Sequence, residues 1–188
     1  MNALDEAGLL RQSDMSPSPA VSLSIDGLRD VVLEQPVEKD DLEGLSQVSA
    51  MAQKYGIGVA ADEACRSLED AHRICNTSSG KALCDIINIK LSKVGVIAAL
   101  SIVDICVRSG VELMIGGMVE TRMGMGFAAC FAAGLDCFKY VDLDTPLLLQ
   151  GDVINGDKVT LCQSCWTCNA KHSKGGLGLS IEESLWLN

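Results

Sequence analysis

The chain has 188 residues, of which 48% are hydrophobic, 4% aromatic and 21% charged, and its formal net charge is −10. An apolar fraction of this size excludes a disordered chain and is enough for one domain with an aliphatic core. The negative charge argues against nonspecific binding to nucleic acid or to anionic membranes. We therefore expect no nucleic-acid partner and no membrane partner.

The N-terminal segment does not resemble a secretory signal. Its first twenty residues include Asp5, Glu6 and Asp14 and have no apolar stretch, and no run in the chain reaches the ~18 apolar residues of a spanning helix. The nine cysteines lie mostly in apolar stretches, as Cys106 does, and are expected to be reduced thiols. We expect a cytoplasmic protein, with a plastid location left open.

Residues 1–30 are expected to be irregular apart from a short alternating run at 21–25. Beyond them, apolar runs alternate with amphipathic stretches, which predicts strands and helices in turn. The predicted strands cover 31–34, 57–62, 85–90, 112–117 and 138–143, and the predicted helices cover 40–55, 67–75, 95–108 and 121–133. This order predicts an α/β fold with a parallel sheet over residues 31–150. Residues 151–188 lose the regularity and are expected to form an irregular Cys- and Gly-rich tail.

Three charged residues, Glu34, Asp62 and Lys90, recur at one interval of 28 residues. Each lies at or near the end of a predicted strand, and the interval fits one strand, one helix and two loops. In a parallel barrel the C-terminal strand ends converge on one face, where catalytic groups lie. The spacing therefore predicts two carboxylates and an amine in one pocket.

Glu34 and Asp62 are hard oxygen ligands, which suit Mg²⁺, or Mn²⁺ as an alternative, better than zinc. Lys90 ends an apolar strand, where a lysine is costly unless it is paired or functional. Beside a metal ion it would be able to act as a general base. The alternatives left open are two ordinary loop carboxylates and a lysine that reaches solvent.

Asp142 and Asp144 flank Leu143, so both side chains point the same way in an extended segment. Two carboxylates on one face would hold an ammonium group of a substrate. The alternative is an ordinary turn, because Asp-Thr-Pro favours one. Glu120 follows a segment with two glycines, whose backbone allows close approach of a ligand.

Five motifs resemble the enolase superfamily, and within it the muconate-lactonizing branch, with the dipeptide (L-Ala-D/L-Glu type) epimerases as the nearest match. The resemblance covers about residues 31–150. The motifs are Leu33-Glu34-Gln35-Pro36, Ala61-Asp62-Glu63, Asn88-Ile89-Lys90-Leu91, Gly117-Met118-Val119-Glu120 and Val141-Asp142-Leu143-Asp144.

This resemblance implies about five strand–helix units of a TIM-like (β/α)₇β barrel. It implies an isomerase in which Glu34 and Asp62 hold Mg²⁺ and Lys90 is the acid/base that removes a proton next to a carboxylate, giving an enolate. It further implies a dipeptide or related carboxylate as the small-molecule substrate. Asp142 and Asp144 would bind its ammonium group, and Met118 and Glu120 would also line the substrate site.

The chain departs from the family pattern before Glu34. The family's first metal-binding Asp, its Lys-x-Lys motif and its N-terminal capping domain have no counterpart there. We therefore expect a truncated or alternatively spliced member, with the level of activity, the exact substrate and the oligomeric state left open. The alternatives are a non-catalytic barrel fragment that pairs with another chain, a homo-oligomer included, and another activity of the same branch: cycloisomerase, N-acylamino acid racemase or succinylbenzoate synthase.

The C-terminal tail contains a second candidate metal site. Cys162, Cys165, Cys168 and His172 have a C-x₂-C-x₂-C-x₃-H spacing, which is able to bind zinc or an iron–sulfur cluster. The alternative is a set of ordinary thiols in an irregular tail, and the family resemblance offers no counterpart to this cluster.

Overall fold

The computed structural model describes residues 31–78 and 80–152 with their side chains. Beyond residue 152 it describes only the backbone of short strands at 154–155, 159–162, 165–168 and 180–181. The predicted irregular segment at 1–30, with its short alternating run, lies outside the described residues.

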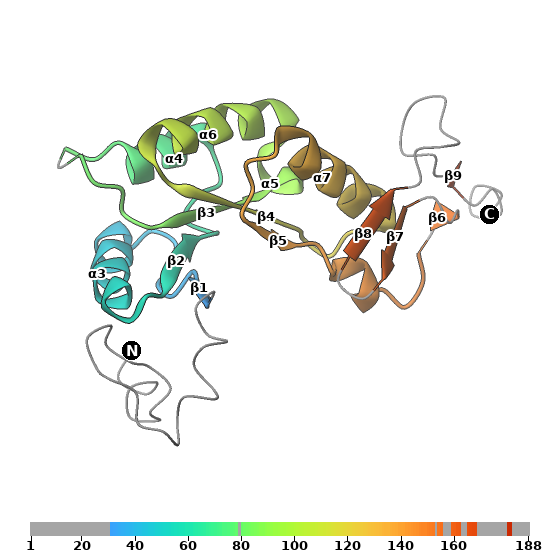
Figure 1. Ribbon diagram of the computed structural model, residues 1–188, viewed down its shortest axis with the longest axis horizontal. Helices are drawn as coiled ribbons and strands as arrows, with labels where there is room; N and C mark the ends of the chain where they lie inside the picture. Colours follow the sequence, from blue (N-terminus) through green and yellow to red (C-terminus); the bar gives the residue numbers. More distant parts are fainter. Residues whose placement is uncertain are drawn as a thin grey trace, which may run out of the picture. The chain divides into compact units, whose positions relative to one another are not determined.

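Five strands form one sheet in the order β1-β2-β3-β4-β5, which is also their order along the chain (Figure 1). Their bounds are β1 Val32–Glu34, β2 Gly58–Ala61, β3 Ile86–Lys90, β4 Glu112–Gly116 and β5 Tyr140–Asp142. The pairs β1–β2, β2–β3 and β4–β5 are parallel. Parallel neighbours need a crossover, and a helical segment supplies one between each strand and the next. The predicted alternation of strands and helices is thus present.

The helical segments lie close to their predicted ranges. Their bounds are α3 Leu42–Ala52, η1 Gln53–Tyr55, α4 Leu68–Cys75, α5 Leu91–Val94, α6 Val96–Ser109, α7 Arg122–Leu135 and η2 Thr145–Leu148. The short helix α5 was not predicted as a separate element, since only four residues separate the end of β3 from Gly95. Gly95, at φ 75°, separates α5 from α6.

The chain divides into two compact units, each described by itself below. Of the residues described with their side chains, the first unit contains those within 31–88 and 97–112, and the second contains those within 89–96 and 113–152. Aliphatic side chains from strands and helices form the core of the first unit, among them Leu45, Val59, Ile74, Ile86, Ile87 and Ile102. The core of the second unit includes Leu113, Ile115, Met125 and Ala128.

Asp85, just before β3, fastens helix α3 to the sheet in the first unit. Its Oδ2 accepts hydrogen bonds from Ser49 Oγ at 2.9 Å and from the backbone N of Val59 at 3.0 Å. Its Oδ1 accepts a hydrogen bond from Gln53 Nε2 at 2.6 Å. A carboxylate that accepts three hydrogen bonds stabilises this junction at the N-terminal end of the strands.

Side-chain caps set the starts of the helices. Asp41 Oδ1 accepts from the backbone N of Gly44 at the start of α3. Oγ of Ser67, the N-cap residue of α4, accepts from the backbone N of Asp70 at 3.1 Å. Asp152 Oδ2 accepts from both N and Nε of Arg122, the first residue of α7, at 2.8 and 3.2 Å. Each acceptor satisfies a backbone N–H that lacks a partner within its helix.

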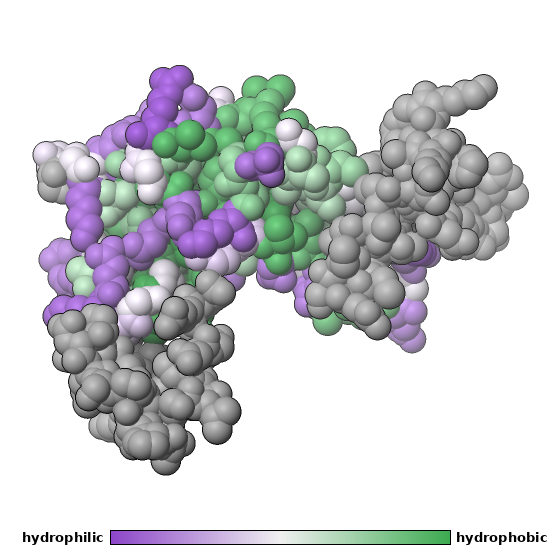
Figure 2. Space-filling model, viewed as in Figure 1, coloured by the Kyte–Doolittle hydropathy of each residue, from purple (hydrophilic) through white to green (hydrophobic). Residues whose placement is uncertain are grey.

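The edge strands are less buried than the central ones. The side chains of β2, β3 and β4 are almost all buried, whereas those of β1 and β5 are half-buried or exposed. Helix α6 also presents apolar side chains outward, Ile97 being 79% and Val107 59% exposed, and Figure 2 shows the apolar surface over this helix. Apolar side chains of α6 therefore lie at the surface of the described part of the chain.

The tail contains short strands that its sequence did not reveal. β6 (Ile154–Asn155) pairs with β9 (Ser180–Ile181), and β7 (Val159–Cys162) pairs with β8 (Cys165–Cys168), both antiparallel. Among the residues that the structure describes, no helix is both long and apolar enough to cross a bilayer.

Candidate active site

The predicted site residues lie at the C-terminal ends of their strands. Glu34, Lys90 and Asp142 are the last residues of β1, β3 and β5, and Asp62 directly follows β2. Gly117, which opens the segment to Glu120, directly follows β4. In parallel α/β sheets this is the end at which ligands bind.

In the first unit, Glu34 contacts a buried asparagine on β3. Nδ2 of Asn88 donates a hydrogen bond to Oε1 of Glu34 at 2.8 Å. The side chain of Glu34 is exposed, whereas Asn88 is 1% and Asp62 3% exposed. Oδ1 of Asn88 is buried and has no hydrogen-bond partner in the described part of the chain.

Gln35 joins the ends of β1 and β2. Its Oε1 accepts hydrogen bonds from the backbone N of Asp62 and of Ala64, at 2.9 and 3.0 Å. Its own backbone N donates to the carbonyl oxygen of Ala60 at 2.8 Å. Gln35 has φ 39°, a left-handed conformation that costs a residue with a Cβ about 1–2 kcal/mol. Strain of this kind is frequent at functional sites.

The oxygen atoms of the first unit fit a hard divalent cation. Among the described residues, no three His, Cys, Asp or Glu side chains gather closely enough to hold a metal ion by themselves. The donors present are the carboxylates of Glu34 and Asp62, and the unpartnered amide oxygen of Asn88. Carboxylate and amide oxygens are ligands that Mg²⁺ and Ca²⁺ prefer, and Mg²⁺ often keeps several waters around one or two carboxylates. These residues therefore fit Mg²⁺.

In the second unit, Lys90 lies within electrostatic range of a pair of carboxylates. Burial raises the pKa of Asp142 above its ordinary value, the negative charge of Asp144 and a hydrogen bond with it raise the pKa further, and the positive charge of Lys90 lowers it. Asp142 thus lies within hydrogen-bonding distance of Asp144, and the charge of Lys90 is close enough to act on Asp142. The turn predicted as the alternative is also present, since the 3₁₀ turn η2 begins at Thr145.

Glu120 is held beside the N-terminal end of α7. Its Oε1 accepts hydrogen bonds from Ser92 Oγ at 2.9 Å and from the backbone N of Met118 at 3.1 Å. A Cβ on Gly124 would lie 2.6 Å from Oε2 of Glu120, so a larger residue at this position would displace the end of the Glu120 side chain. Met118 is 48% exposed.

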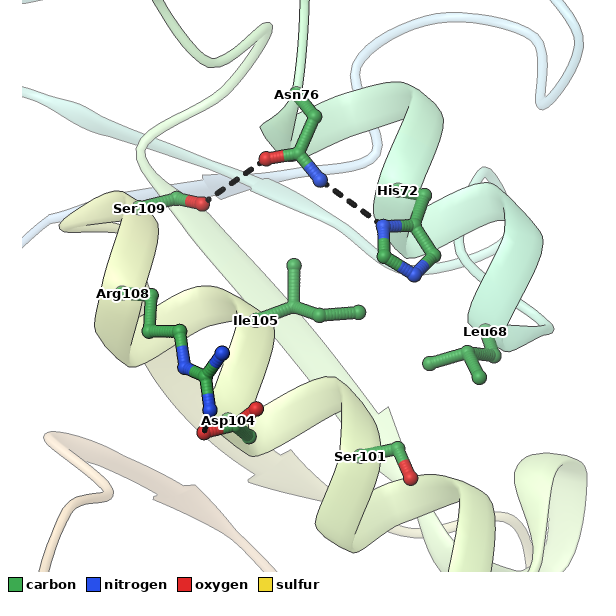
Figure 3. Close-up of a pocket in the computed structure, with 8 residues that line it drawn as sticks. All are labelled: Leu68, His72, Asn76, Ser101, Asp104, Ile105, Arg108 and Ser109. Atoms are coloured by element: carbon green, nitrogen blue, oxygen red, sulfur yellow. Dashed lines mark hydrogen bonds and ion pairs between the residues drawn. The ribbon is translucent and has the colours of Figure 1, made fainter.

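A surface pocket of about 290 Å³ lies apart from the strand ends, between α4 and α6 (Figure 3). Ser109 Oγ donates to Oδ1 of Asn76 at 3.5 Å, and Nδ2 of Asn76 donates to Nδ1 of His72 at 2.9 Å. These bonds join the C-terminal end of α4 to the end of α6. None of the residues predicted to be catalytic or metal-binding lines this pocket.

Known proteins resemble the chain over most of its length. Residues 21–185 match the family model described as Enolase C-terminal domain-like. The L-Ala-D/L-amino acid epimerase of Populus trichocarpa is 55% identical over 136 residues, which are 71% of this chain and 31% of that protein. A mandelate racemase/muconate lactonizing enzyme structure from Roseiflexus sp. superposes with a TM-score of 0.74 at 35% identity, covering 96% of this chain and 45% of that one.

A third similar protein is a dipeptide epimerase of Cytophaga hutchinsonii, whose structure is a complex with Mg and the dipeptide D-Ala-L-Val. It superposes with a TM-score of 0.66 at 27% identity, over 86% of this chain and 41% of that one. The family match spans most of the chain, and this decides the classification. The chain belongs to the Enolase C-terminal domain-like family.

The family match confirms the predicted resemblance and fold class. The enolase-like chain is an α/β protein whose five-stranded sheet is part of a TIM-like barrel. It spans about a third of the length of the curated relatives it matches.

Gln35 and Asn88 belong to this enolase-like site. The sequence motifs include both residues, but no role was predicted for either. Gln35 gave no signal, because glutamine has no preference for a left-handed backbone. Asn88 gave a signal that was readable: it is the polar residue inside the apolar run Ile86-Ile87-Asn88-Ile89. Of the predicted thiolate site, His172 and the side chains of Cys162, Cys165 and Cys168 lie outside the described residues, so that site stays a prediction.

Proposed function

We propose that this chain forms the part of a Mg²⁺-dependent dipeptide epimerase that carries the acid/base lysine, two metal ligands and the ammonium-binding carboxylates. Its membership of the family and its similarity to proteins named as dipeptide epimerases support this proposal. The chain spans about a third of the length of the Populus relative. The epimerase activity of the complete relatives is therefore proposed for this chain and does not follow from the similarity alone.

The observation that carries the proposal is the arrangement around Asp142. The raised pKa of this carboxylate has burial and the adjacent Asp144 as its main causes, and the charge of Lys90 acts on it in the opposite direction. Two carboxylates side by side repel each other unless a cation lies between them. An α-ammonium group of a dipeptide would relieve that repulsion and would place the rest of the substrate beside the amine of Lys90.

In the proposed reaction Lys90 removes the proton from the α-carbon and returns one to it. Asp142 and Asp144 hold the ammonium group and so fix the distance from the α-carbon to Lys90. Glu34 and Asp62 hold the cation, and Gln35 keeps the backbone at Asp62 in place. A bound Mg²⁺ supplies the positive charge that stabilises the negative charge developing on the substrate carboxylate.

The carboxylate pair favours a substrate with a free ammonium group over the other substrates of the muconate-lactonizing branch. An N-acylamino acid, a muconate-like lactone and a succinylbenzoate precursor have no positive charge to place between Asp142 and Asp144. A dipeptide with a free N-terminus does. The proposal is therefore a dipeptide substrate, with the side chains of that dipeptide left unspecified.

Deuterium exchange tests this proposal. The full chain is incubated with L-Ala-L-Glu and Mg²⁺ in D₂O, and loss of the Glu α-proton signal is followed by NMR. Exchange, rather than inversion, is the right readout, because a lone base on one face of the carbon supports exchange by itself. We expect exchange with the wild-type chain and none with Lys90→Met.

The exchange test has two controls. Lys81→Met removes an exposed amine in the loop before β3 and should leave exchange unchanged. N-acetyl-L-Ala-L-Glu lacks the ammonium group and should exchange far more slowly than the free dipeptide. Equal exchange with Lys90→Met, or with the acetylated dipeptide, would refute the proposed role of Lys90 or of the carboxylate pair.

A second candidate is a non-catalytic role through pairing with another chain. The observation that favours it is the exposure of the edge strands, with Val141 of β5 58% exposed where the central strands are buried. Sedimentation velocity at several protein concentrations distinguishes the two proposals. A concentration-dependent dimer without any deuterium exchange would favour pairing, and an exchanging monomer would exclude it.

A further inference from the structure

Asn88 combines one satisfied and one unsatisfied polar group in a buried side chain. It is 1% exposed on β3, and its strand neighbours Ile87 and Ile89 are buried as well. Nδ2 donates to Glu34 Oε1 at 2.8 Å. Oδ1 is buried without a hydrogen-bond partner in the described part of the chain. A buried acceptor without a donor is costly, and such groups are rare in folded proteins.

The orientation of the Asn88 amide follows from its contact with Glu34. If nitrogen and oxygen exchanged places, Oδ1 would face the carboxylate oxygen of Glu34, and two acceptors would repel each other. Nδ2 would then lose its acceptor. The orientation with Nδ2 toward Glu34 is therefore the favourable one, and the unsatisfied oxygen is a property of the site.

A leucine has the same branching at Cγ and would keep this strand apolar without leaving an unsatisfied oxygen. An asparagine at position 88 therefore needs a partner for Oδ1 that the described part of the chain does not supply. The partner must donate a hydrogen bond or carry positive charge, and it must be small, because the site is buried. It also lies next to Glu34, which the proposed function assigns to a divalent cation.

We propose that Asn88 is a positioning residue of the cation site. Its Nδ2 fixes the carboxylate of Glu34, and its Oδ1 accepts a hydrogen bond from a water molecule that the cation brings into the site. Mg²⁺ retains several waters when one or two carboxylates bind it. This inference rests on the proposed function, since it requires that Glu34 and Asp62 hold the cation.

The proposal predicts that Asn88→Leu lowers the Mg²⁺ affinity without lowering the stability of the cation-free chain. Without a cation, Asn88→Leu should unfold at the same temperature as wild type or higher, because it removes a buried unsatisfied acceptor and the exposed Glu34 retains water. With a cation, the same variant should lose about 10- to 100-fold in Mg²⁺ affinity, the usual effect of removing a group that orients a metal ligand. A structural role would instead lower the cation-free stability.

The test is a Mg²⁺ titration of the full chain, followed by thermal unfolding and by calorimetry, for wild type, Asn88→Leu, Asn88→Asp and Ser49→Ala. Asn88→Asp places a second negative charge beside Glu34. It should unfold at a lower temperature without Mg²⁺ and gain more stability than wild type when Mg²⁺ is added. Ser49→Ala removes a buried hydroxyl that is bonded to Asp85 at the opposite end of the strands. It should lower stability and leave Mg²⁺ affinity unchanged.

The outcomes distinguish this inference from the function on which it rests. If wild type binds no Mg²⁺, the proposed cation site is wrong and the inference fails with it. If wild type and Asn88→Leu bind Mg²⁺ equally, the cation site stands and the role of Asn88 is wrong. A cation-free Asn88→Leu that unfolds well below wild type would also overturn the inference, since it would show a structural role.

Discussion

The side-chain oxygen Oε1 of Gln35 accepts a hydrogen bond from the backbone N of Asp62 at 2.9 Å. The same oxygen accepts from Ala64 N at 3.0 Å, and Gln35 reaches this position with φ 39°. The residue after one predicted metal ligand therefore holds the backbone of the other. The two strand ends are fixed relative to each other before any ligand binds, and such preorganisation lowers the cost of binding.

Gln35→Ala should lower the free energy of unfolding by about 2 kcal/mol. The substitution leaves two backbone N–H groups, at Asp62 and Ala64, without their acceptor, and it keeps a Cβ on a left-handed backbone. Urea denaturation monitored by circular dichroism measures the change. Gln35→Gly should lower the free energy of unfolding by less than Gln35→Ala, because glycine adopts this backbone conformation readily. A Gln35→Ala chain within ~0.5 kcal/mol of wild type would contradict the importance of these bonds.

Two glycines of the second unit should respond in opposite directions to substitution by alanine. A Cβ on Gly117 would meet Sδ of the buried Met125 and lie 2.8 Å from its Cε. Gly117→Ala should therefore destabilise the chain by about 1–3 kcal/mol through overpacking. In α7, a Cβ on Gly134 would meet no atom within 4 Å. Gly134→Ala should stabilise the chain by about 0.5–1 kcal/mol, because alanine favours a helix. Equal changes in the free energy of unfolding at the two positions would contradict the predicted difference in the space around Gly117 and Gly134.

Asp142→Asn should stabilise the chain at neutral pH. The pKa of Asp142 is raised in the folded chain by burial and by Asp144, so the folded state holds its proton more tightly than the unfolded state does. Stability from this group is then full below the ordinary carboxyl pKa and is lost as the pH rises through the raised value. The asparagine does not ionise and should avoid this loss.

Thermal unfolding at pH 3 and pH 7 measures the Asp142 effect. The increase in unfolding temperature of Asp142→Asn over wild type should be larger at pH 7 than at pH 3. Asp40→Asn makes the same change of charge at an exposed position and serves as the control. A gain at pH 3 that equals the gain at pH 7 would show that repulsion between Asp142 and Asp144 is not its source.

The buried thiols should resist alkylation in the folded chain. Burial raises the pKa of Cys84 to about 12, and the thiolate is the form that reacts. The Cys106 side chain is fully buried, and its pKa is raised by a hydrogen bond with Cys75 and by burial. Iodoacetamide at pH 8, followed by peptide mass mapping, should modify the exposed Cys130 and leave Cys84 and Cys106 intact. Modification of Cys84 at the rate of Cys130 would contradict this burial.

The sequence predicted what depends on local patterns. Apolar runs ending in charged residues located the strands and the positions of Glu34, Asp62 and Lys90 at their ends. The hydrogen bonds of Gln35 and the unpartnered oxygen of Asn88 depend on contacts between distant strands, and no pattern within one strand encodes them. Helix α5 has four residues, too few for a periodic signal.

The proposed function requires that Glu34 and Asp62 together hold a divalent cation. Isothermal titration of Mg²⁺ into wild type, Glu34→Gln, Asp62→Asn and Glu63→Gln tests it most directly. Glu63→Gln removes the same charge one residue beyond Asp62, on an exposed side chain. We predict saturable binding to wild type and Glu63→Gln, and its loss in Glu34→Gln and Asp62→Asn. Mg²⁺ binding of equal strength in all four chains would show that Glu34 and Asp62 do not hold the cation.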